Sequence, residues 1–230
     1  MSKVVFPIDI AAIAFDLDGT LVDTLPDLHA ASNRTLNDLG RDEVDIETVR
    51  GFVGAGIDRL VMRLLTGASD GEPDVALFDR ARKLFREHYS ANLADNSAAY
   101  PDVVPTLDRM RALGLRLACI TNKADAFTRP LLDTLGLMSK LDLVISGDSL
   151  ARKKPDPLPL RHCAETFGIG VERLLMVGDS NTDTQAARAA GCPVFCVPYG
   201  YRGGAGLAEL DCDAIVPTVS EVLERIRTVR

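Results

Sequence analysis

Two aspartates, Asp16 and Asp18, follow the apolar run 10–14 and are separated by one residue. In an extended chain, residues two apart point to the same side, so both carboxylates would face one way unless the chain bends. Their repulsion, on the order of several kcal/mol at low effective dielectric, must be relieved by a cation, a shared proton or solvent. The pair alone also fits a polar strand end with an Asp-Gly turn at Gly19. Other parts of the sequence are therefore needed to distinguish a catalytic or cation-binding pair of aspartates from a simple turn.

Three later apolar runs also end in polar residues. These ends are Thr121-Asn122-Lys123 after the run 115–120, Lys153-Lys154-Pro155 after 143–145, and Gly178-Asp179 with Asp183 after 174–177. Open parallel sheets bind ligands beyond the carboxyl ends of their strands, so we expect these residues to meet Asp16 and Asp18. Each end has a simpler alternative, which is a helix cap at Thr121 or at 179–183 and a solvated charged turn at Lys154.

The grouped aspartates are suited to magnesium. Mg²⁺ prefers octahedral oxygen coordination with few protein carboxylates and several waters, and Asp16, Asp179 and a main-chain carbonyl could supply that set. The prolines at 155 and 157 stiffen the loop that carries Lys154 and would hold its amine in one place. A rigid lysine beside carboxylates can neutralise a phosphate.

Two kinds of apolar pattern divide the chain. Between residues 23 and 97, apolar residues recur at helical spacing, which predicts helices at about 24–39, 45–52, 57–65 and 73–92. The first of these begins with a predicted capping box, in which Thr24 is the N-cap and Asp27 lies in the first turn. Residues 23–97 are therefore expected to form a small helical insertion.

Beyond residue 100, helical patterns alternate with short apolar runs at 115–120, 143–145, 174–177, 194–197 and 214–216. This alternation predicts right-handed βαβ units on a parallel sheet, which the run 10–15 would join. The predicted fold class is α/β, with a Rossmann-like parallel sheet that has helices on both faces. Residues 1–22 and 98–230 would form this core, and residues 23–97 a helical cap domain inserted into it.

Composition narrows the classes of partner. The 230 residues carry a formal charge of −7 with scattered Lys and Arg, so no footprint for nucleic acid is present. No apolar run approaches the roughly 18 to 20 residues needed to span a bilayer, and Asp9 interrupts any leader, so we expect neither anchor nor signal peptide. Five cysteines without a CxxC pair fit a reducing cytoplasm.

Together these residues resemble the haloacid dehalogenase-like hydrolase superfamily. The likeness rests on Asp-x-Asp-Gly-Thr at 16–20, Thr121, Lys154-Pro155, and Gly-Asp-x-x-x-Asp at 178–183, all matched without departure. It covers essentially the whole chain, and residues 23–97 look like the small helical cap of that superfamily. The segments 50–56, 121–123, 153–155 and 199–201 also look like those of bacterial phosphoglycolate phosphatases.

The resemblance implies a Mg²⁺-dependent phosphatase that hydrolyses a small phosphate monoester, with 2-phosphoglycolate as the preferred substrate and glycolate and phosphate as products. By this resemblance Asp16 attacks phosphorus to give an aspartyl phosphate. Asp18 protonates the departing alkoxide and then takes a proton from the hydrolytic water. Thr121, Asn122 and Lys154 would bind the phosphate oxygens. Thr121 and Lys154 thus count as both catalytic and substrate-binding residues.

The resemblance also implies the metal ligands. Mg²⁺ would be held by the Asp16 side chain, the Asp18 carbonyl oxygen and Asp179. Asp183 would act either through water or as an anchor behind the ligands.

The cap is expected to select the substrate. Glycines around Gly54 would let main-chain amides approach a ligand, and Arg50 or Arg59 could meet a carboxylate. The alternative is a flexible loop between helices with surface arginines. The roles of Lys123 and Lys153 stay open.

Three other functions remain possible from the sequence. One is another sugar-phosphate phosphatase, and a second is a phosphosugar mutase of the same fold, which must protect its aspartyl phosphate from water. The third is a catalytically inactive binding protein on this fold. For the leading hypothesis, the partner is a small phosphorylated metabolite, with no nucleic acid or membrane, and the protein is a cytoplasmic monomer or homodimer.

Overall fold

A parallel sheet with the strand order β6-β5-β2-β7-β8-β9 forms the centre of the computed structural model, which describes residues 5–202 and 206–229. Its strands are β2 (Ala12–Phe15), β5 (Arg116–Ile120), β6 (Leu143–Ile145), β7 (Leu174–Gly178), β8 (Val194–Cys196) and β9 (Ala214–Ile215). The chain moves outward from β2 through β5 to β6, and then returns to β7 on the other side of β2. The strand order therefore reverses between β2 and β7, where sheets of this kind bind ligands.

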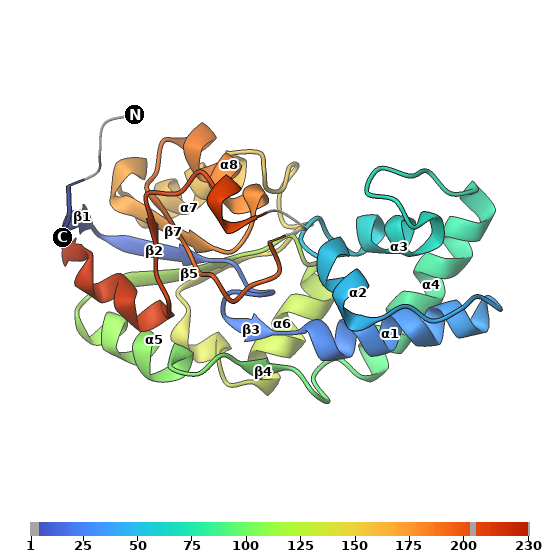
Figure 1. The fold of residues 1–230 in the computed structure, drawn as a ribbon. Coiled ribbons are helices and arrows are strands. Elements are labelled where there is room, and N and C mark those ends of the chain that lie inside the picture. The colour runs from blue at the N-terminus through green and yellow to red at the C-terminus, as the bar shows by residue number, and fades with distance from the viewer. Residues whose placement is uncertain (1–4, 203–205, 230) are drawn as a thin grey trace.

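Both faces of the sheet are buried because helices cover them (Figure 1). Ile13 and Phe15 pack in one cluster with α5 (Val103–Ala112) and α6 (Asp125–Thr134). Ala12 and Ala14 pack in a second cluster with α7 (Leu158–Phe167) and α8 (Asn181–Ala190). Alternate residues of one strand thus serve opposite layers, which explains the continuous apolar runs. The predicted α/β fold class is confirmed.

Four helices lie between two short strands that pair with each other. The helices are α1 (Leu25–Asp38), α2 (Ile46–Phe52), α3 (Ile57–Thr66) and α4 (Val75–Ala91). The strands β3 (Val22–Asp23) and β4 (Ala98–Ala99) run antiparallel, with Val22 opposite Ala99. The helices share a hydrophobic cluster, which Phe127 of α6 and Tyr201 also join, and Figure 1 shows the helices to one side of the sheet. One narrow ribbon therefore carries both connections between the helical part and the sheet.

The first strand is shorter than the sequence indicates. Ile10 belongs to β1 (Ile8–Ile10), which pairs with β10 (Ile226–Thr228) in a separate two-stranded sheet. The chain bends at Ala11, and only Ala12–Phe15 enter the main sheet. Short 3-10 helices complete the fold at Met138–Lys140, Val171–Arg173, Leu207–Glu209 and Val219–Glu224.

The predicted capping box at the start of α1 is wrong. The Thr24 hydroxyl donates to Asp18 Oδ1 at 2.7 Å instead of capping its own helix. The Tyr201 hydroxyl oxygen accepts the main-chain N–H groups of Thr24 and Leu25, at 2.7 and 2.9 Å. Asp27 instead binds the segment that leads from the helices back to the sheet, where Ser97 N and Oγ donate to the Asp27 carboxylate at 2.8 and 2.6 Å. Tertiary partners thus replace the local cap.

The five cysteines are free thiols, and four of them are buried. Burial raises the pKa of the Cys163 and Cys192 thiols to about 12, so both stay protonated at neutral pH. Within residues 5–202 and 206–229, the helices are too short or too polar to span a bilayer.

Candidate active site

Loops that follow three neighbouring strands, and the loop that carries Lys154, meet at the carboxyl edge of the sheet. Asp16 follows β2, Thr121 follows β5 and Asp179 follows β7, and these three residues are buried together with Lys154. The Lys154 amine lies 3.0 Å from Asp16 Oδ1 and 2.6 Å from Asp183 Oδ1. Segments more than a hundred residues apart in sequence therefore form one polar site, in the place that the strand order indicates.

Asp16 is fixed on one side and open on the other. Its Oδ1 accepts the Leu17 main-chain N–H at 2.7 Å and the Lys154 amine. Its Oδ2 has no hydrogen-bond donor within the described part of the chain. Burial, together with the charges of Asp183 and Asp18, raises the pKa of Asp16 to about 7, although the Lys154 charge opposes this. The carboxylate is thus oriented by one oxygen while the other faces the site.

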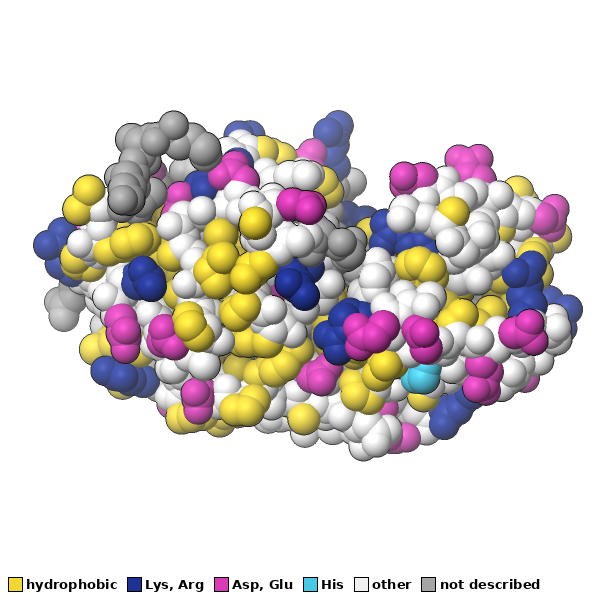
Figure 2. All heavy atoms as spheres, in the orientation of Figure 1, with side chains coloured by type: hydrophobic (Ala, Val, Ile, Leu, Met, Phe, Trp, Pro, Cys, Tyr) yellow, Lys and Arg dark blue, Asp and Glu magenta, His cyan; other side chains and the backbone are white. Residues whose placement is uncertain are grey.

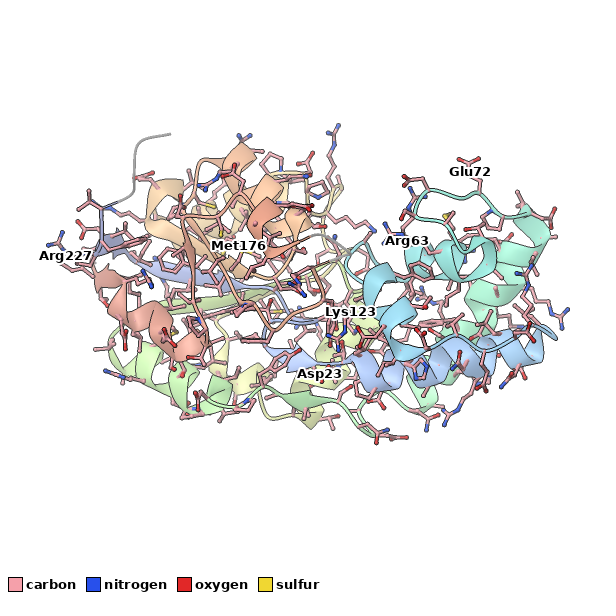
Figure 3. The ribbon with its side chains drawn as sticks, in the orientation of Figure 1. Asp23, Arg63, Glu72, Lys123, Met176 and Arg227 are labelled. Carbon is pink, nitrogen blue, oxygen red and sulfur yellow. The ribbon has the colours of Figure 1, made fainter. Side chains whose placement is uncertain are left out.

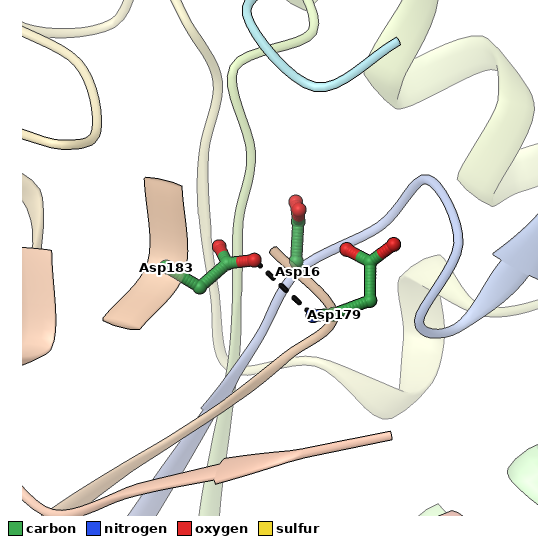
Figure 4. A group of neighbouring side chains, drawn as sticks. All are labelled: Asp16, Asp179 and Asp183. Atoms are coloured by element: carbon green, nitrogen blue, oxygen red, sulfur yellow. Dashed lines mark hydrogen bonds between the residues drawn. The ribbon is translucent and has the colours of Figure 1, made fainter. Parts of the chain in front are cut away.

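Asp179 and Asp183 lie on either side of Asp16 in the view of Figure 4, and their environments differ. Asp183 is fully used, since its Oδ1 accepts from Lys154 and its Oδ2 accepts from Asp179 N at 3.2 Å and from Ser180 Oγ at 2.8 Å. Asp179 Oδ2 accepts the main-chain N–H groups of Tyr201 and Arg202. No donor from residues 5–202 or 206–229 reaches Asp179 Oδ1. Asp183 thus stabilises the loop, and Asp179 presents a free oxygen.

The donor set fits a divalent cation. One carboxylate oxygen from each of Asp16, Asp179 and Asp183 lies within 4.8 Å of the other two. Burial and the nearby charges of Asp183 and Asp16 raise the pKa of Asp179 well above its ordinary value, so the cation-free site resists ionisation. Gly200 packs tightly against Asp179, because a Cβ on Gly200 would lie 2.2 Å from Asp179 Cβ. A hard cation with oxygen ligands would relieve this excess of negative charge.

Asp18 faces away from Asp183, toward the helical part of the molecule. It accepts the Lys123 amine at 2.9 Å and the Thr24 hydroxyl at 2.7 Å. Lys123 is buried and lies 4.8 Å from the centre of the Tyr89 ring, which belongs to α4 (Figure 3). Burial lowers the pKa of Lys123, but the attraction of Asp18 outweighs this and raises it overall, so the amine stays charged.

Sequence reasoning left the role of Lys123 open. The available signal was its position directly after Thr121-Asn122 at a strand end. Its partner Asp18 lies 105 residues away, so the pairing itself could not be seen.

A narrow cavity lies between the aspartates and the helices. It has a volume of about 30 Å³, counted as the space open to the centre of a water-sized sphere. Its polar wall consists of Asp16, Asp18, Thr121, Asn122 and Lys123, and its other wall of Leu28, Val53, Gly54, Gly56, Ile57 and Leu60. The Thr121 oxygen accepts the Lys123 N–H at 3.2 Å, which leaves the hydroxyl hydrogen free to donate into the cavity. The cavity therefore suits a small ligand with an anionic end.

Asn122 and Gly54 join the two parts of the molecule. The Asn122 amide donates to the Gly54 carbonyl at 3.1 Å and to the Lys154 carbonyl at 2.9 Å. Both amide hydrogens are therefore occupied, and a phosphate would have to be met by the main-chain N–H of Asn122 instead.

The structure places Arg59 away from the site. Its guanidinium pairs with Asp70 at 2.8 Å and lines a separate hollow with Met62 and Phe78. It points this way because it lies on α3 two residues after the cavity-lining residue Ile57, about half a turn round the helix and therefore on the opposite face.

A second hollow, of about 100 Å³, shares Gly54 with the cavity and is also lined by Arg63, Asn181 and Arg202. Figure 2 shows Lys and Arg side chains along the notch between the two parts of the molecule, and Arg63 is labelled at its edge in Figure 3. Positive charge at the approach to a site attracts anions.

Comparison with known proteins decides the family. A sequence profile of the haloacid dehalogenase-like hydrolases matches residues 13–197. The chain belongs to that family. This hydrolase is 53% identical over 222 residues to the phosphoglycolate phosphatase of Nitrosospira multiformis. The alignment covers 96% of this chain and 98% of the relative.

Other relatives agree. The hydrolase is 50% identical over 216 residues to the phosphoglycolate phosphatase of Thiobacillus denitrificans. The alignment covers 94% of this chain and 95% of the relative. Its fold matches the crystal structure of a predicted phosphoglycolate phosphatase from Haemophilus somnus with a TM-score of 0.88 and 33% identity, covering 94% of this chain and 97% of that one. The family resemblance inferred from the motifs is confirmed.

Proposed function

We propose that this hydrolase is a Mg²⁺-dependent phosphatase that cleaves a small phosphate monoester, and that 2-phosphoglycolate is its preferred substrate. The observation that carries the proposal is the state of Asp16, a buried carboxylate held by Lys154 and Leu17 N through one oxygen with the other oxygen free. Such a group can act as a nucleophile without reorganising.

In the proposed reaction, the free Asp16 oxygen forms a bond to phosphorus while the ester P–O bond breaks. The departing alkoxide takes its proton from Asp18, which lines the same cavity. Water then attacks the aspartyl phosphate and gives a proton to Asp18, which releases phosphate and restores Asp16. The Lys154 amine and the Thr121 hydroxyl would donate to the phosphate oxygens, and Asn122 would use its main-chain N–H.

Magnesium would be held by the Asp16 carboxylate through the oxygen that does not attack phosphorus, by the free oxygen of Asp179 and by the Asp18 carbonyl, where it would neutralise charge on the transferring phosphate. Asp183 would act behind the ligands, since both its oxygens already accept hydrogen bonds from Lys154, Asp179 N and Ser180. This arrangement favours the anchoring role for Asp183 over direct coordination.

Residues 1–22 and 98–230 would form the catalytic core, and residues 23–97 a cap domain that closes on the substrate. The pairing of β3 with β4 at the junction and the separate hydrophobic cluster of α1–α4 support this division. Closure would exclude bulk water and test the leaving group.

The preference for 2-phosphoglycolate rests on two supports. The relatives with 53% and 50% identity carry the name phosphoglycolate phosphatase. The cavity wall opposite the aspartates carries apolar side chains such as Leu28, Ile57 and Leu60, which offer no hydrogen bonds to the hydroxyls of a sugar. Action in the cytoplasm as a monomer or homodimer belongs to the same proposal, as does the absence of nucleic-acid and membrane partners; the buried free thiols fit a reducing compartment.

The test is phosphate release from a panel of small esters, with and without Mg²⁺, for the wild type and Asp16→Asn. We expect metal-dependent turnover with the highest kcat/KM on 2-phosphoglycolate, and no detectable turnover by Asp16→Asn. Asp9→Asn is the matched control, because Asp9 is a remote aspartate paired with Arg227. Full activity of Asp16→Asn would exclude the nucleophile, an isomer instead of phosphate would indicate a mutase, and no reaction with any ester would indicate a binding protein.

A further inference from the structure

Tyr201 belongs to the core by sequence position, but its side chain packs in the hydrophobic cluster of the helices α1–α4. The residue is buried. Its ring lies 5.6 Å from the Arg50 guanidinium of α2, and its edge lies close to the turn at Gly19. Tyr201 therefore touches the helical part and the catalytic turn at once.

The Tyr201 hydroxyl is the nearer of two side-chain acceptors at the start of α1, where Asp23 Oδ1 also accepts the Leu25 N–H at 3.3 Å. It accepts the N–H groups of Thr24 and Leu25 at 2.7 and 2.9 Å, and it donates to Asp23 Oδ1 at 2.7 Å. The helix has no side-chain cap of its own, so the oxygen of a residue 177 positions away performs that role. All three partners lie where the chain leaves the core for the helices, and Asp23 is labelled at this junction in Figure 3.

Both ends of Tyr201 connect to aspartates of the site. Its main-chain N–H donates to Asp179 Oδ2. At the other end, Thr24, whose N–H is held by the Tyr201 hydroxyl, donates its own hydroxyl to Asp18 Oδ1 at 2.7 Å. The path from Tyr201 to Thr24 to Asp18 thus consists of one buried and one partly buried hydrogen bond.

We propose that Tyr201 is a positioning residue, which fixes the start of α1 so that Thr24 holds Asp18 in place for proton transfer to the leaving group. The inference rests on the proposed function, since it assigns to Asp18 the role of general acid. It adds a residue of the core that links the placement of the helical part to that acid. The Tyr201 main-chain contact to Asp179 is separate from the hydroxyl and is kept when only the hydroxyl is removed.

The test compares Tyr201→Phe with Tyr199→Phe, which removes a hydroxyl from the same segment. The Tyr199 hydroxyl donates to the Thr20 carbonyl at 2.9 Å and makes no hydrogen bond to α1. Two substrates of similar size distinguish an effect on protonation of the leaving group from an effect on phosphoryl transfer itself. 2-Phosphoglycolate loses an alkoxide that needs a proton, whereas acetyl phosphate loses acetate, which does not.

For Tyr201→Phe, we expect kcat/KM on 2-phosphoglycolate to fall about tenfold or more, and kcat/KM on acetyl phosphate to fall less than about threefold. The Mg²⁺ concentration for half-maximal rate should stay within about twofold of wild type, because the N–H to Asp179 remains. Tyr199→Phe should not change the ratio between the two substrates. An equal loss on both substrates, or the same ratio as in Tyr199→Phe, would overturn the inference and leave Tyr201 a structural residue.

If Tyr201→Phe does not fold, Thr24→Val carries the test, with Thr24→Ser as the conservative variant. Thr24→Val should lower the ratio of activity on 2-phosphoglycolate to activity on acetyl phosphate, and Thr24→Ser should keep the wild-type ratio. An unchanged ratio in Thr24→Val contradicts the proposal. If the wild type cleaves neither substrate, the proposed function fails and, with it, the role given to Asp18. Hydrogen exchange of residues 22–28 is then decisive for the remaining claim, because faster exchange in Tyr201→Phe than in Tyr199→Phe supports the hold on α1, and equal exchange refutes it.

Discussion

Asp16 and Asp18 are two residues apart, but the fold gives them separate partners. Asp16 contacts Lys154, while Asp18 contacts Lys123 and Thr24. Each carboxylate has its own buried lysine, so their mutual repulsion is relieved without a shared proton. This separation allows one to act as nucleophile and the other to move protons.

The role of Asp18 can be tested by removing its charge and keeping its shape. Asp18→Asn should lower kcat on 2-phosphoglycolate by about a hundred- to ten-thousandfold, because an amide cannot exchange the required protons. Inhibition by inorganic phosphate should change little, since Lys154 and Thr121 are intact. Steady-state kinetics with phosphate as inhibitor measure both. A variant that has lost its circular-dichroism spectrum would instead show that Asp18 is structural.

At the scale of elements, the connection between α1 and β4 depends on one buried carboxylate. Asp27 of α1 accepts hydrogen bonds from Asn96 N at 3.0 Å and from Ser97 N at 2.8 Å, and these residues directly precede β4. Burial raises the pKa of Asp27, but the hydrogen bonds from Ser97 and Asn96 outweigh burial and lower it overall.

This lowered pKa predicts a pH dependence of stability. A carboxyl group whose folded-state pKa lies below its unfolded value of about 3.9 stabilises the fold fully above that value, and the contribution is lost as the pH falls through the folded-state pKa. Asp27→Asn should therefore lower the free energy of unfolding by about 1.5 to 3 kcal/mol at pH 7. The difference from wild type should shrink below about pH 4. Urea unfolding at several pH values measures it, with the exposed Asp42→Asn as control, and a difference constant down to pH 3 would contradict the prediction.

The loop after β8 also packs against Asp179, a proposed Mg²⁺ ligand. A Cβ on Gly200 would lie 2.2 Å from Asp179 Cβ, so Gly200→Ala must displace that carboxylate. We expect the Mg²⁺ concentration for half-maximal activity to rise about tenfold or more, with a smaller change in KM for substrate. A magnesium titration of activity provides the measurement.

Gly170→Ala is the matched control for this substitution. Its Cβ would also meet a carboxylate, but the contact is with the end of the exposed Glu172 side chain, which can rotate away. The control should keep the wild-type Mg²⁺ dependence. Equal Mg²⁺ dependence of Gly200→Ala and wild type would show that Asp179 does not bind the metal.

At the scale of the whole molecule, the buried acidic cluster of Asp16, Asp179 and Asp183 should oppose folding, and the proposed Mg²⁺ should relieve this cost. A ligand that binds only the folded state stabilises it by about 2.7 kcal/mol at a hundred times its Kd. For a chain of this size, that corresponds to a rise in Tm of roughly 5 to 10 °C. Differential scanning fluorimetry with and without MgCl₂ should show this rise for the wild type and for Asp9→Asn.

Asp179→Asn should lose the rise. Its Tm without metal should equal or exceed that of the wild type, because the substitution removes one charge from a buried acidic group whose pKa is already raised. A full Mg²⁺-dependent rise in Asp179→Asn would place the cation elsewhere.

Much of the site was predictable from local sequence. The apolar runs fix which residues enter the sheet, and polar residues directly after them must lie at its carboxyl edge, as Asp16, Thr121 and Asp179 do. The helices of 23–97 follow in the same way from their 3.6-residue period. These features depend on residues close together along the chain, so local sequence patterns predict them.

Only the tertiary structure decided which distant groups meet. The partner of the α1 N-terminus is Tyr201 instead of Thr24, and Arg59 pairs with Asp70 instead of lining the cavity. Thr24 and Tyr201 are 177 residues apart, and no local pattern predicts that the Tyr201 hydroxyl accepts the Thr24 N–H. A buried N–H or carboxylate accepts whichever partner the packing brings within about 3 Å, so this choice follows from the packing of the whole chain.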